Sequence, residues 1–285
     1  MNKKTALITG ATSGIGYVTA VELAKKGFDI IIVARNEAKA KDLIKVIGNN
    51  AKADFVSCDL SSIASVKLAV EVIKSRYSKI DVLINNAGVL VQNKQFSVDN
   101  IELTFATNHI GPFVLTTGLI DLLKAARRAR VIHLSSAAHY FAFFDINKLV
   151  NPPRYQDLIV YGRSKLANIL FSNELADRLS DFGISSNSAH PGTVASNFAG
   201  DGTGVSAIFM KIFRPFFKST AKGAATSIYL ATSPEVEGVT GSYFVNSRAG
   251  ATSAASRDKE LGKALWILSE ELAKRSSEPA DQHLV

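Results

Sequence analysis

The feature that most constrains this chain is a regular alternation of short apolar runs with long amphipathic stretches. The apolar runs, such as Ile30-Ile31-Ile32-Val33, are nearly continuous and do not alternate with polar residues. Continuous apolar strands are expected where helices cover both faces of a parallel sheet. The pattern therefore predicts an α/β fold in which strands and helices follow one another in turn.

The expected elements can be placed by residue range. The predicted strands are Thr5–Thr9, Asp29–Ala34, Asp54–Cys58, Ile80–Asn85, Arg130–Ser135, Ile184–Ala189 and Ser242–Val245. The predicted helices are 14–27, 37–47, 62–77, 99–126, 157–182, 221–232 and 257–275. Seven parallel strands with helices on both faces form one doubly wound, Rossmann-type sheet. No linker or internal repeat divides the chain, so residues 1–285 are predicted to form a single domain.

Composition excludes several classes of protein. With 47% hydrophobic and 20% charged residues, the chain is neither disordered nor collagen-like. The single cysteine, Cys58, cannot form an internal disulfide, so nothing argues for an oxidising compartment. No stretch reaches the roughly 18 apolar residues of a membrane span, and no long hydrophobic leader opens the sequence. A cytoplasmic protein is expected.

The net charge of +8 raises the question of nucleic acid. The positive residues are spread along the chain, and their densest cluster, at 124–130, lies where a helix is predicted to end. Cations are favoured there by the helix dipole. A basic surface or an anionic cofactor is therefore favoured over nucleic-acid binding. The five histidines show no ligand spacing, so no metal is expected.

A glycine-rich turn joins the first predicted strand to the first helix. It reads Thr9-Gly10-Ala11-Thr12-Ser13-Gly14-Ile15-Gly16. Glycines permit a tight turn and let backbone N–H groups approach a pyrophosphate, while the helix N-terminus adds favourable partial charge. The candidate cofactor-binding residues are Gly10, Ser13, Gly14, Ile15 and Gly16. The alternative is a merely flexible loop.

The end of the second predicted strand indicates which dinucleotide would bind. Sites for NAD carry an acidic residue there, which binds the ribose 2′-hydroxyl. Residues 33–36 contain no Asp or Glu, and Arg35 offers a guanidinium suited to a 2′-phosphate. NADP(H) is favoured over NAD(H). The alternative is that Arg35 simply begins a solvated helix.

Tyr161 and Lys165 lie four residues apart at the start of a predicted helix, so they share one face. A neighbouring ammonium is expected to lower the pKa of a phenol from about 10 toward working pH, which acid–base catalysis needs. Alone, the pair could be an exposed helical pair. Polar residues also follow the fourth, fifth and sixth strands, and the carboxyl ends of parallel strands are where ligands bind.

Together these residues resemble the short-chain dehydrogenase/reductase family over about residues 4–246. The motifs are the 9–16 glycine turn, Asp59-Leu60, Asn85-Asn86-Ala87-Gly88, Asn108, Ser136, Tyr161-x-x-x-Lys165 and Pro191-Gly192. The runs at 108–113, 135–139 and 161–168 look like the retinol-dehydrogenase-like subgroup. The chain departs from that subgroup at Pro112, which stands where a histidine is common, and in lacking a hydrophobic N-terminal anchor.

The resemblance implies a role for each catalytic candidate. Tyr161 is the general acid/base that protonates the carbonyl oxygen, and Ser136 hydrogen-bonds that oxygen. Lys165 holds the nicotinamide ribose, and Asn108 positions a water in the proton relay. The implied cofactor contacts are Asp59 and Leu60 beside the adenine, Asn86, Ala87 and Gly88 beside the ribose, and Tyr161, Lys165, Pro191, Gly192 and Val194.

The family carries its substrate lid at the positions of residues 192–220 here. Four phenylalanines and Met210 within 205–217 can line an apolar pocket, which predicts a small lipophilic aldehyde, ketone or alcohol as substrate. Two alternatives are a short core helix and a helix that touches an anionic membrane surface, since Lys211, Arg214 and Lys218 lie there.

The resemblance thus predicts an NADP(H)-dependent oxidoreductase, a carbonyl reductase or alcohol dehydrogenase. The alternative is a non-catalytic NADP(H)-sensing regulator on the same fold, because fold alone does not decide function. Helices 99–126 and 157–182 commonly form a dimer interface in the family, so a homodimer is expected.

Overall fold

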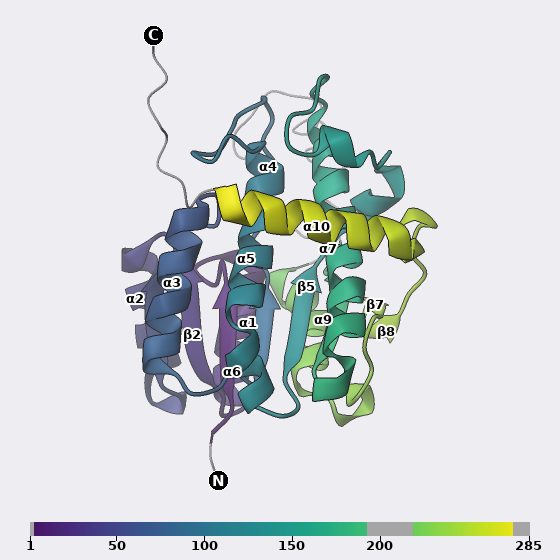
Figure 1. Cartoon of the computed structure of the whole chain (residues 1–285). Coiled ribbons are helices and arrows are strands. Elements are labelled where there is room, and N and C mark those ends of the chain that lie inside the picture. Colours follow the sequence, from purple (N-terminus) through teal and green to yellow (C-terminus); the bar gives the residue numbers. More distant parts are fainter. Residues whose placement is uncertain (1–2, 193–218, 276–285) are drawn as a thin grey trace.

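The computed structural model of the chain describes residues 3–192 and 219–275. Within them, one sheet has the strand order β3-β2-β1-β4-β5-β6-β7-β8 (Figure 1). The strands are β1 Thr5–Thr9, β2 Asp29–Ala34, β3 Ala53–Ser57, β4 Val82–Asn85, β5 Arg130–Leu134, β6 Ser185–His190, β7 Tyr243–Val245 and β8 Arg248–Ala249. Strands β1 to β7 are parallel, which confirms the predicted doubly wound sheet.

The helices are close to the predicted ranges, with one exception. They are α1 Gly14–Lys25, α2 Glu37–Ile47, α3 Ile63–Arg76, α4 Leu103–Phe105, α5 Gly111–Gly118, α6 Ile120–Ala125, α7 Asp157–Leu179, α9 Thr220–Thr232 and α10 Lys259–Arg275. A π-helical segment, η2 Ala106–Ile110, joins α4 to α5. The short 3-10 helices are η1 Gly48–Asn50, η3 Ala137–Phe141, η4 Ile146–Lys148, η5 Ser180–Phe182, η7 Pro234–Val236 and η8 Ala255–Arg257.

Helices cover both faces of the sheet, so the protein has a core on each. Along β1, Leu7 packs into one core while Ala6 and Ile8 pack into the other. Helices α3, α5, α7 and α10 contribute to the first core, and α1, α2 and α9 to the second. This arrangement is the physical reason for the continuous apolar strands, because successive side chains point to opposite faces.

The predicted helix 99–126 begins four residues later than expected. Glu102, which is fully buried, accepts hydrogen bonds from the N–H groups of Thr104 and Phe105, at 2.9 and 2.7 Å, and so caps the helix. The preceding chain forms a turn in which Asn100 has a φ of +56°. Capping chemistry, which hydrophobic periodicity does not report, sets this boundary.

Helix α10 runs across the outside of α5 and α7 (Figure 1). Its Trp266 ring lies 5.0 Å from the ring of Phe113 and 5.8 Å from that of Phe171, centroid to centroid. The Arg178 guanidinium lies over the Trp266 ring, 4.1 Å from its centroid. Helix α10 therefore closes the first core from outside.

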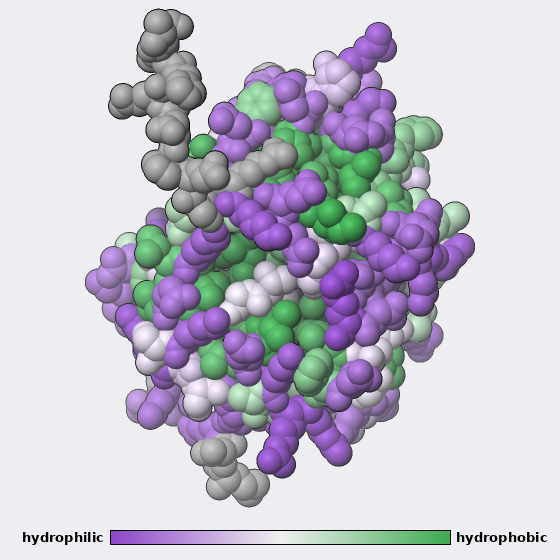
Figure 2. All heavy atoms as spheres, in the orientation of Figure 1, coloured by the Kyte–Doolittle hydropathy of each residue, from purple (hydrophilic) through white to green (hydrophobic). Residues whose placement is uncertain are grey.

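The face that carries α10 is mostly hydrophilic, with hydrophobic residues showing between the helices (Figure 2). This is the usual surface of amphipathic helices packed on a sheet. Among the described residues, none of the helices combines the length and apolarity that crossing a bilayer requires.

Candidate active site

Thr9 and Asn86 fasten the glycine turn to the end of β4. The Thr9 hydroxyl accepts hydrogen bonds from the N–H groups of Asn86 and Ala87, both at 3.0 Å. In return, the Asn86 side-chain amide donates to the Thr9 carbonyl at 2.8 Å. A Cβ atom on Gly16 would lie 2.4 Å from Asn86 Nδ2 and 2.5 Å from the Gly10 carbonyl oxygen. The turn is thus held rigidly, which disfavours a merely flexible loop.

The N-terminus of α1 is open to an anion. Gly10 and Gly14 have φ values of +66° and +56°, a conformation that favours glycine. Ser13 stands at the N-cap, but its side chain makes no capping hydrogen bond. The first-turn N–H groups, including that of Ile15, therefore lack a side-chain cap, and a diphosphate fits this position well.

Arg35 and Asp59 follow neighbouring strands of the sheet. Arg35 is exposed directly after β2. Asp59 follows β3, and its carboxylate accepts hydrogen bonds from the Ser61 N–H and hydroxyl at 3.0 and 2.7 Å. The Leu60 side chain is buried in the first core, and its carbonyl packs against Gly111. A cofactor contact from Leu60 would therefore use its backbone.

The side chain of Asn108 lies in the π segment and is fully buried. Its amide donates to the Val89 carbonyl at 2.9 Å and to the Ser164 hydroxyl at 3.0 Å, and it accepts from the Val89 N–H at 2.7 Å. A Cβ on Gly88 would lie 3.1 Å from Lys165 Nζ and 3.3 Å from Asn108 Oδ1. Three predicted site residues, Gly88, Asn108 and Lys165, therefore meet at one point.

Lys165 is almost fully buried, at 3% exposure, on the third turn of α7. Its ammonium donates to the Leu134 carbonyl at 3.1 Å and lies 5.5 Å from the centroid of the Tyr161 ring. The predicted helical face shared by Tyr161 and Lys165 is thus present. Burial lowers the pKa of Lys165 to about 8.

The two serines after β5 have different roles in the structure. The Ser135 hydroxyl is buried and donates to the Lys165 backbone carbonyl at 2.8 Å. Ser136 is half-buried, and its hydrogen bond with Tyr161 lowers the pKa of that phenol. This difference supports Ser136, not Ser135, as the serine beside the reacting group.

The prediction that the pKa of Tyr161 is lowered is wrong for the protein without cofactor. Burial raises the pKa of the phenol above its ordinary value, and this effect exceeds the lowering by the Ser136 hydrogen bond. The sequence showed the nearby ammonium but not the depth at which the phenol lies. Desolvation disfavours the charged phenolate, so Tyr161 is held in its protonated form.

Sequence reasoning missed two residues that hold the catalytic helix in place. A Cβ on Gly162 would lie 2.6 Å from the Ala138 carbonyl oxygen, so only glycine lets α7 approach η3 this closely. The Ser164 hydroxyl donates to the Tyr161 carbonyl at 2.7 Å while it accepts from Asn108. Gly162 directly follows Tyr161, and Ser164 directly precedes Lys165. Small residues at these two positions were the sequence signal that the helix is closely packed there.

Pro191 and Gly192 follow β6 at the same edge of the sheet, and Gly192 has a φ of +83°. Val194, the aromatic stretch 205–217 and nearly all of the expected lid 192–220 lie outside the described residues. Within the described part of the chain, no three His, Cys, Asp or Glu side chains gather as a metal ion would require.

The lowered pKa of Lys165 predicts a pH dependence of stability. Between pH 8 and about 10.5, its ordinary pKa, the unfolded chain binds a proton at Lys165 that the folded chain does not. The contribution of Lys165 to the free energy of unfolding therefore rises with pH across this window. We expect urea unfolding at pH 8 and pH 10 to show that the free energy of unfolding of the wild type increases, relative to that of Lys165→Met, as the pH rises. A constant difference would contradict the buried ammonium.

Comparisons with known proteins agree with this geometry. A family model described as short chain dehydrogenase matches residues 4–203. The chain is 37% identical over 272 residues to retinol dehydrogenase 12 of Mus musculus, covering 94% of this chain and 86% of that protein. It is 39% identical over 279 residues to the chloroplastic short-chain dehydrogenase TIC 32 B of Brassica napus, covering 93% and 87%.

Solved structures show the same architecture. A crystal structure of an uncharacterised protein from Mycobacterium paratuberculosis superposes with a TM-score of 0.78 and 31% identity, covering 95% of this chain and 93% of that one. A blue fluorescent protein from a metagenomic library, solved in complex with NADPH, superposes with a TM-score of 0.68 and 25% identity, covering 85% and 96%.

Proposed function

The chain belongs to the short-chain dehydrogenase family, and on that premise we propose that it is an NADP(H)-dependent oxidoreductase. It would interconvert a lipophilic aldehyde or ketone and the corresponding alcohol. The observation that carries this proposal is the joint placement of Ser136, Tyr161 and Lys165 beside a glycine-lined edge of the sheet. A sensor would need the glycine turn but not a protonated phenol beside a serine.

The residues of the chain supply the proton side of the reaction. A bound NADP(H) would supply the hydride to the carbonyl carbon. Tyr161, whose burial keeps the phenol protonated, gives its proton to the carbonyl oxygen, while the Ser136 hydroxyl stabilises the developing charge on that oxygen. Lys165 carries an ammonium at neutral pH, since its pKa is about 8, and it can hold a ribose hydroxyl and help restore the proton.

Two observations support a lipophilic substrate. Phe141 and Phe143 lie in the segment that follows Ser136, and they are 71% and 80% exposed. The Arg163 side chain donates to the Phe143 carbonyl at 2.8 Å and so ties this segment to α7. In addition, one relative is named as a retinol dehydrogenase, and retinol is a lipophilic alcohol.

The proposal is tested by following NADPH oxidation with a panel of carbonyl compounds. The panel holds a long-chain aldehyde, an aromatic ketone and a reducing sugar. We expect turnover with the first two and little with the sugar. Tight NADPH binding without turnover on any of the three would favour the sensor, and equal turnover of all three would refute the preference for lipophilic substrates.

The preference for NADP(H) is proposed from Arg35 and from the missing carboxylate at 33–36. Replacing Arg35 by alanine should raise the Kd for NADPH by about tenfold, because one charge-assisted contact to the 2′-phosphate is lost. The Kd for NADH should not change. Isothermal titration with both cofactors measures this effect. Lys45→Ala, which removes an exposed cation at the far end of α2, is the matched control. Equal losses for NADPH and NADH would contradict the assignment.

Assembly and location are also proposals. A homodimer built on α5 and α7 would meet α10, which lies over both helices, so α10 would have to move or take part in the interface. Light scattering distinguishes a dimer from a monomer. We propose one domain for the whole chain and a cytoplasmic location. One plant relative is named as chloroplastic, so fractionation of cells is the test for location.

A further inference from the structure

The side chain of Asn168 shares its hydrogen-bond acceptor with Lys165. Asn168 lies on α7, one turn beyond Lys165, and is 3% exposed. Its amide nitrogen donates to the Leu134 carbonyl at 3.0 Å, and Lys165 Nζ donates to the same oxygen at 3.1 Å. A carbonyl oxygen has two lone pairs, so these two donors use its full capacity. We propose that Asn168 is a positioning residue, which fixes the direction of the Leu134 carbonyl and limits how strongly that carbonyl holds the Lys165 ammonium.

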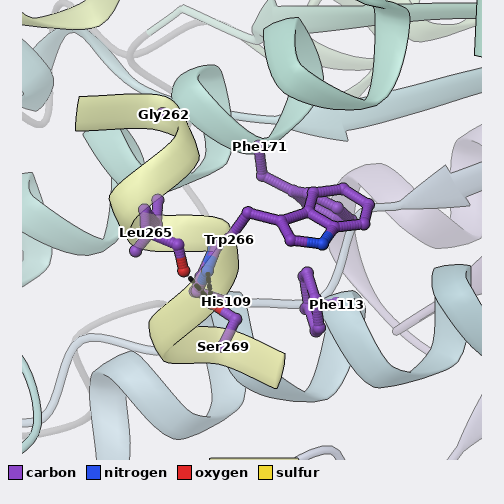
Figure 3. Close-up of a pocket in the computed structure, with 7 residues that line it drawn as sticks. All are labelled: His109, Phe113, Phe171, Gly262, Leu265, Trp266 and Ser269. Atoms are coloured by element: carbon purple, nitrogen blue, oxygen red, sulfur yellow. Dashed lines mark hydrogen bonds between the residues drawn. The ribbon is translucent and has the colours of Figure 1, made fainter. Parts of the chain in front are cut away.

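The Asn168 amide is buried and is held through its nitrogen. The Asn168 side chain lies near the His109 imidazole, whose pKa burial lowers to about 3, but Asn168 Oδ1 and His109 Nδ1 are both buried without a hydrogen-bond partner among the described residues. His109 in turn makes a hydrogen bond of 2.9 Å with Ser269 on α10 (Figure 3). The anchor of the Asn168 amide is therefore its nitrogen, which donates to the Leu134 carbonyl.

The position of the ammonium matters because it borders the same space beside Gly88 as Asn108 Oδ1, which itself accepts from the Val89 N–H. The Lys165 Nζ and Asn108 Oδ1 atoms both lie within 3.3 Å of the position of a Cβ built on Gly88. Because the Leu134 carbonyl is shared between two donors, its hydrogen bond with the Lys165 ammonium is weaker than an unshared one. The ammonium can then rotate to bind a ribose hydroxyl. Without Asn168, the carbonyl would bond the ammonium alone and hold it more tightly.

Burial lowers the pKa of Lys165, and the described groups that face its ammonium are neutral. Strand β5 presents the Leu134 carbonyl, the π segment presents the neutral amide of Asn108, and the end of β4 presents the Gly88 backbone. On α7 itself, the titratable neighbour is Tyr161, which burial keeps protonated. A change at Asn168 should therefore appear directly in the titration of Lys165.

The first test measures that titration in the cofactor-free, full-length protein. The NMR signal of the Lys165 side-chain Cε carbon, assigned by its loss in Lys165→Met, gives the midpoint, which is about 8 in the wild type. Asn168→Leu removes the competing donor, and the midpoint should rise by about half a unit. Asn168→Asp adds a carboxylate, and the midpoint should rise by about one unit or more. The Asp variant raises the midpoint by its charge alone and is the positive control; Asn168→Ala, which also removes the donor, replaces Asn168→Leu if that variant fails to fold.

Asn173 provides the matched control. It lies on the same helix, but its amide donates to the Ser256 carbonyl, at 2.9 Å, away from Lys165. Asn173→Leu and Asn173→Asp should leave the Lys165 midpoint unchanged. An unchanged midpoint in Asn168→Leu, or equal changes in the Asn173 variants, would overturn the inference.

The second test is kinetic and rests on the proposed function. Asn168→Leu should lower kcat by about tenfold, because the ammonium is held back, while KM for the carbonyl substrate stays within about twofold. Asn173→Leu should change neither. If the Lys165 midpoint moves but the wild type reduces no carbonyl compound, the proposed function fails and the positioning role stands. If the wild type is active and the midpoint does not move, the positioning role fails.

Discussion

Replacing Tyr161 by phenylalanine should lower kcat by about 10³-fold and leave the Kd for NADPH within about twofold. The variant keeps the ring but removes the hydroxyl whose proton the proposed mechanism gives to the substrate oxygen. Burial raises the pKa of this phenol, so the wild-type hydroxyl is protonated across the neutral range and ready to donate. Single-turnover reduction of an aldehyde by pre-bound NADPH measures the chemical step directly.

Tyr77→Phe is the matched control for this result. Tyr77 also loses a hydroxyl, which bonds to Asp54 at the surface far from the site, and its kcat should equal that of the wild type. A Tyr161→Phe protein that keeps more than a tenth of the wild-type rate would mean that another group supplies the proton. Ser136 would then be the residue to examine.

The second large effect is expected at Gly16, where alanine should raise the Kd for NADPH by about 100-fold or more. The added methyl group would lie 2.5 Å from the Gly10 carbonyl oxygen, which is backbone, and 2.4 Å from the anchored Asn86 amide. Relief of this overlap must open the turn, and the turn is where a diphosphate would be bound. Fluorescence titration with NADPH measures the change.

Gly262→Ala separates this effect from a general loss of helical glycine. Gly262 lies on α10, and its nearest neighbours to an added Cβ are at 3.8 Å, an ordinary contact distance. This variant should bind NADPH as the wild type does. Should Gly16→Ala also bind normally, with an unchanged melting temperature, the glycine turn would not be the cofactor site.

Much of the fold was predictable because burial and capping leave local marks. The run Ile30-Ile31-Ile32-Val33 predicted a strand covered on both faces. Helix α2 begins at Glu37, as predicted, where Asn36 caps it by accepting from the Lys39 N–H at 2.9 Å. Strand β8 was missed because two exposed residues, Arg248 and Ala249, carry no periodicity. The π segment was missed because one extra residue in a turn does not interrupt an apolar stretch.

The candidate site was predictable where spacing along one element sets the geometry. Tyr161 and Lys165 share a face because they lie four residues apart on one helix. Contacts between distant segments left no such mark. The overlap that Gly162 avoids with the Ala138 carbonyl depends on how closely α7 meets η3. The raised pKa of Tyr161 depends on depth in the folded protein, which no local pattern reports.

The position of α10 has a consequence for the synthesis of the protein. Because Trp266 covers Phe113 and Phe171, the first core stays open on the ribosome until translation has passed this helix. A nascent chain that stalls before Lys259 would expose the hydrophobic surface of α5 and α7 that α10 covers, and such surfaces recruit chaperones or aggregate. Solubility of the product should therefore depend on synthesis of α10 and not on the sheet alone.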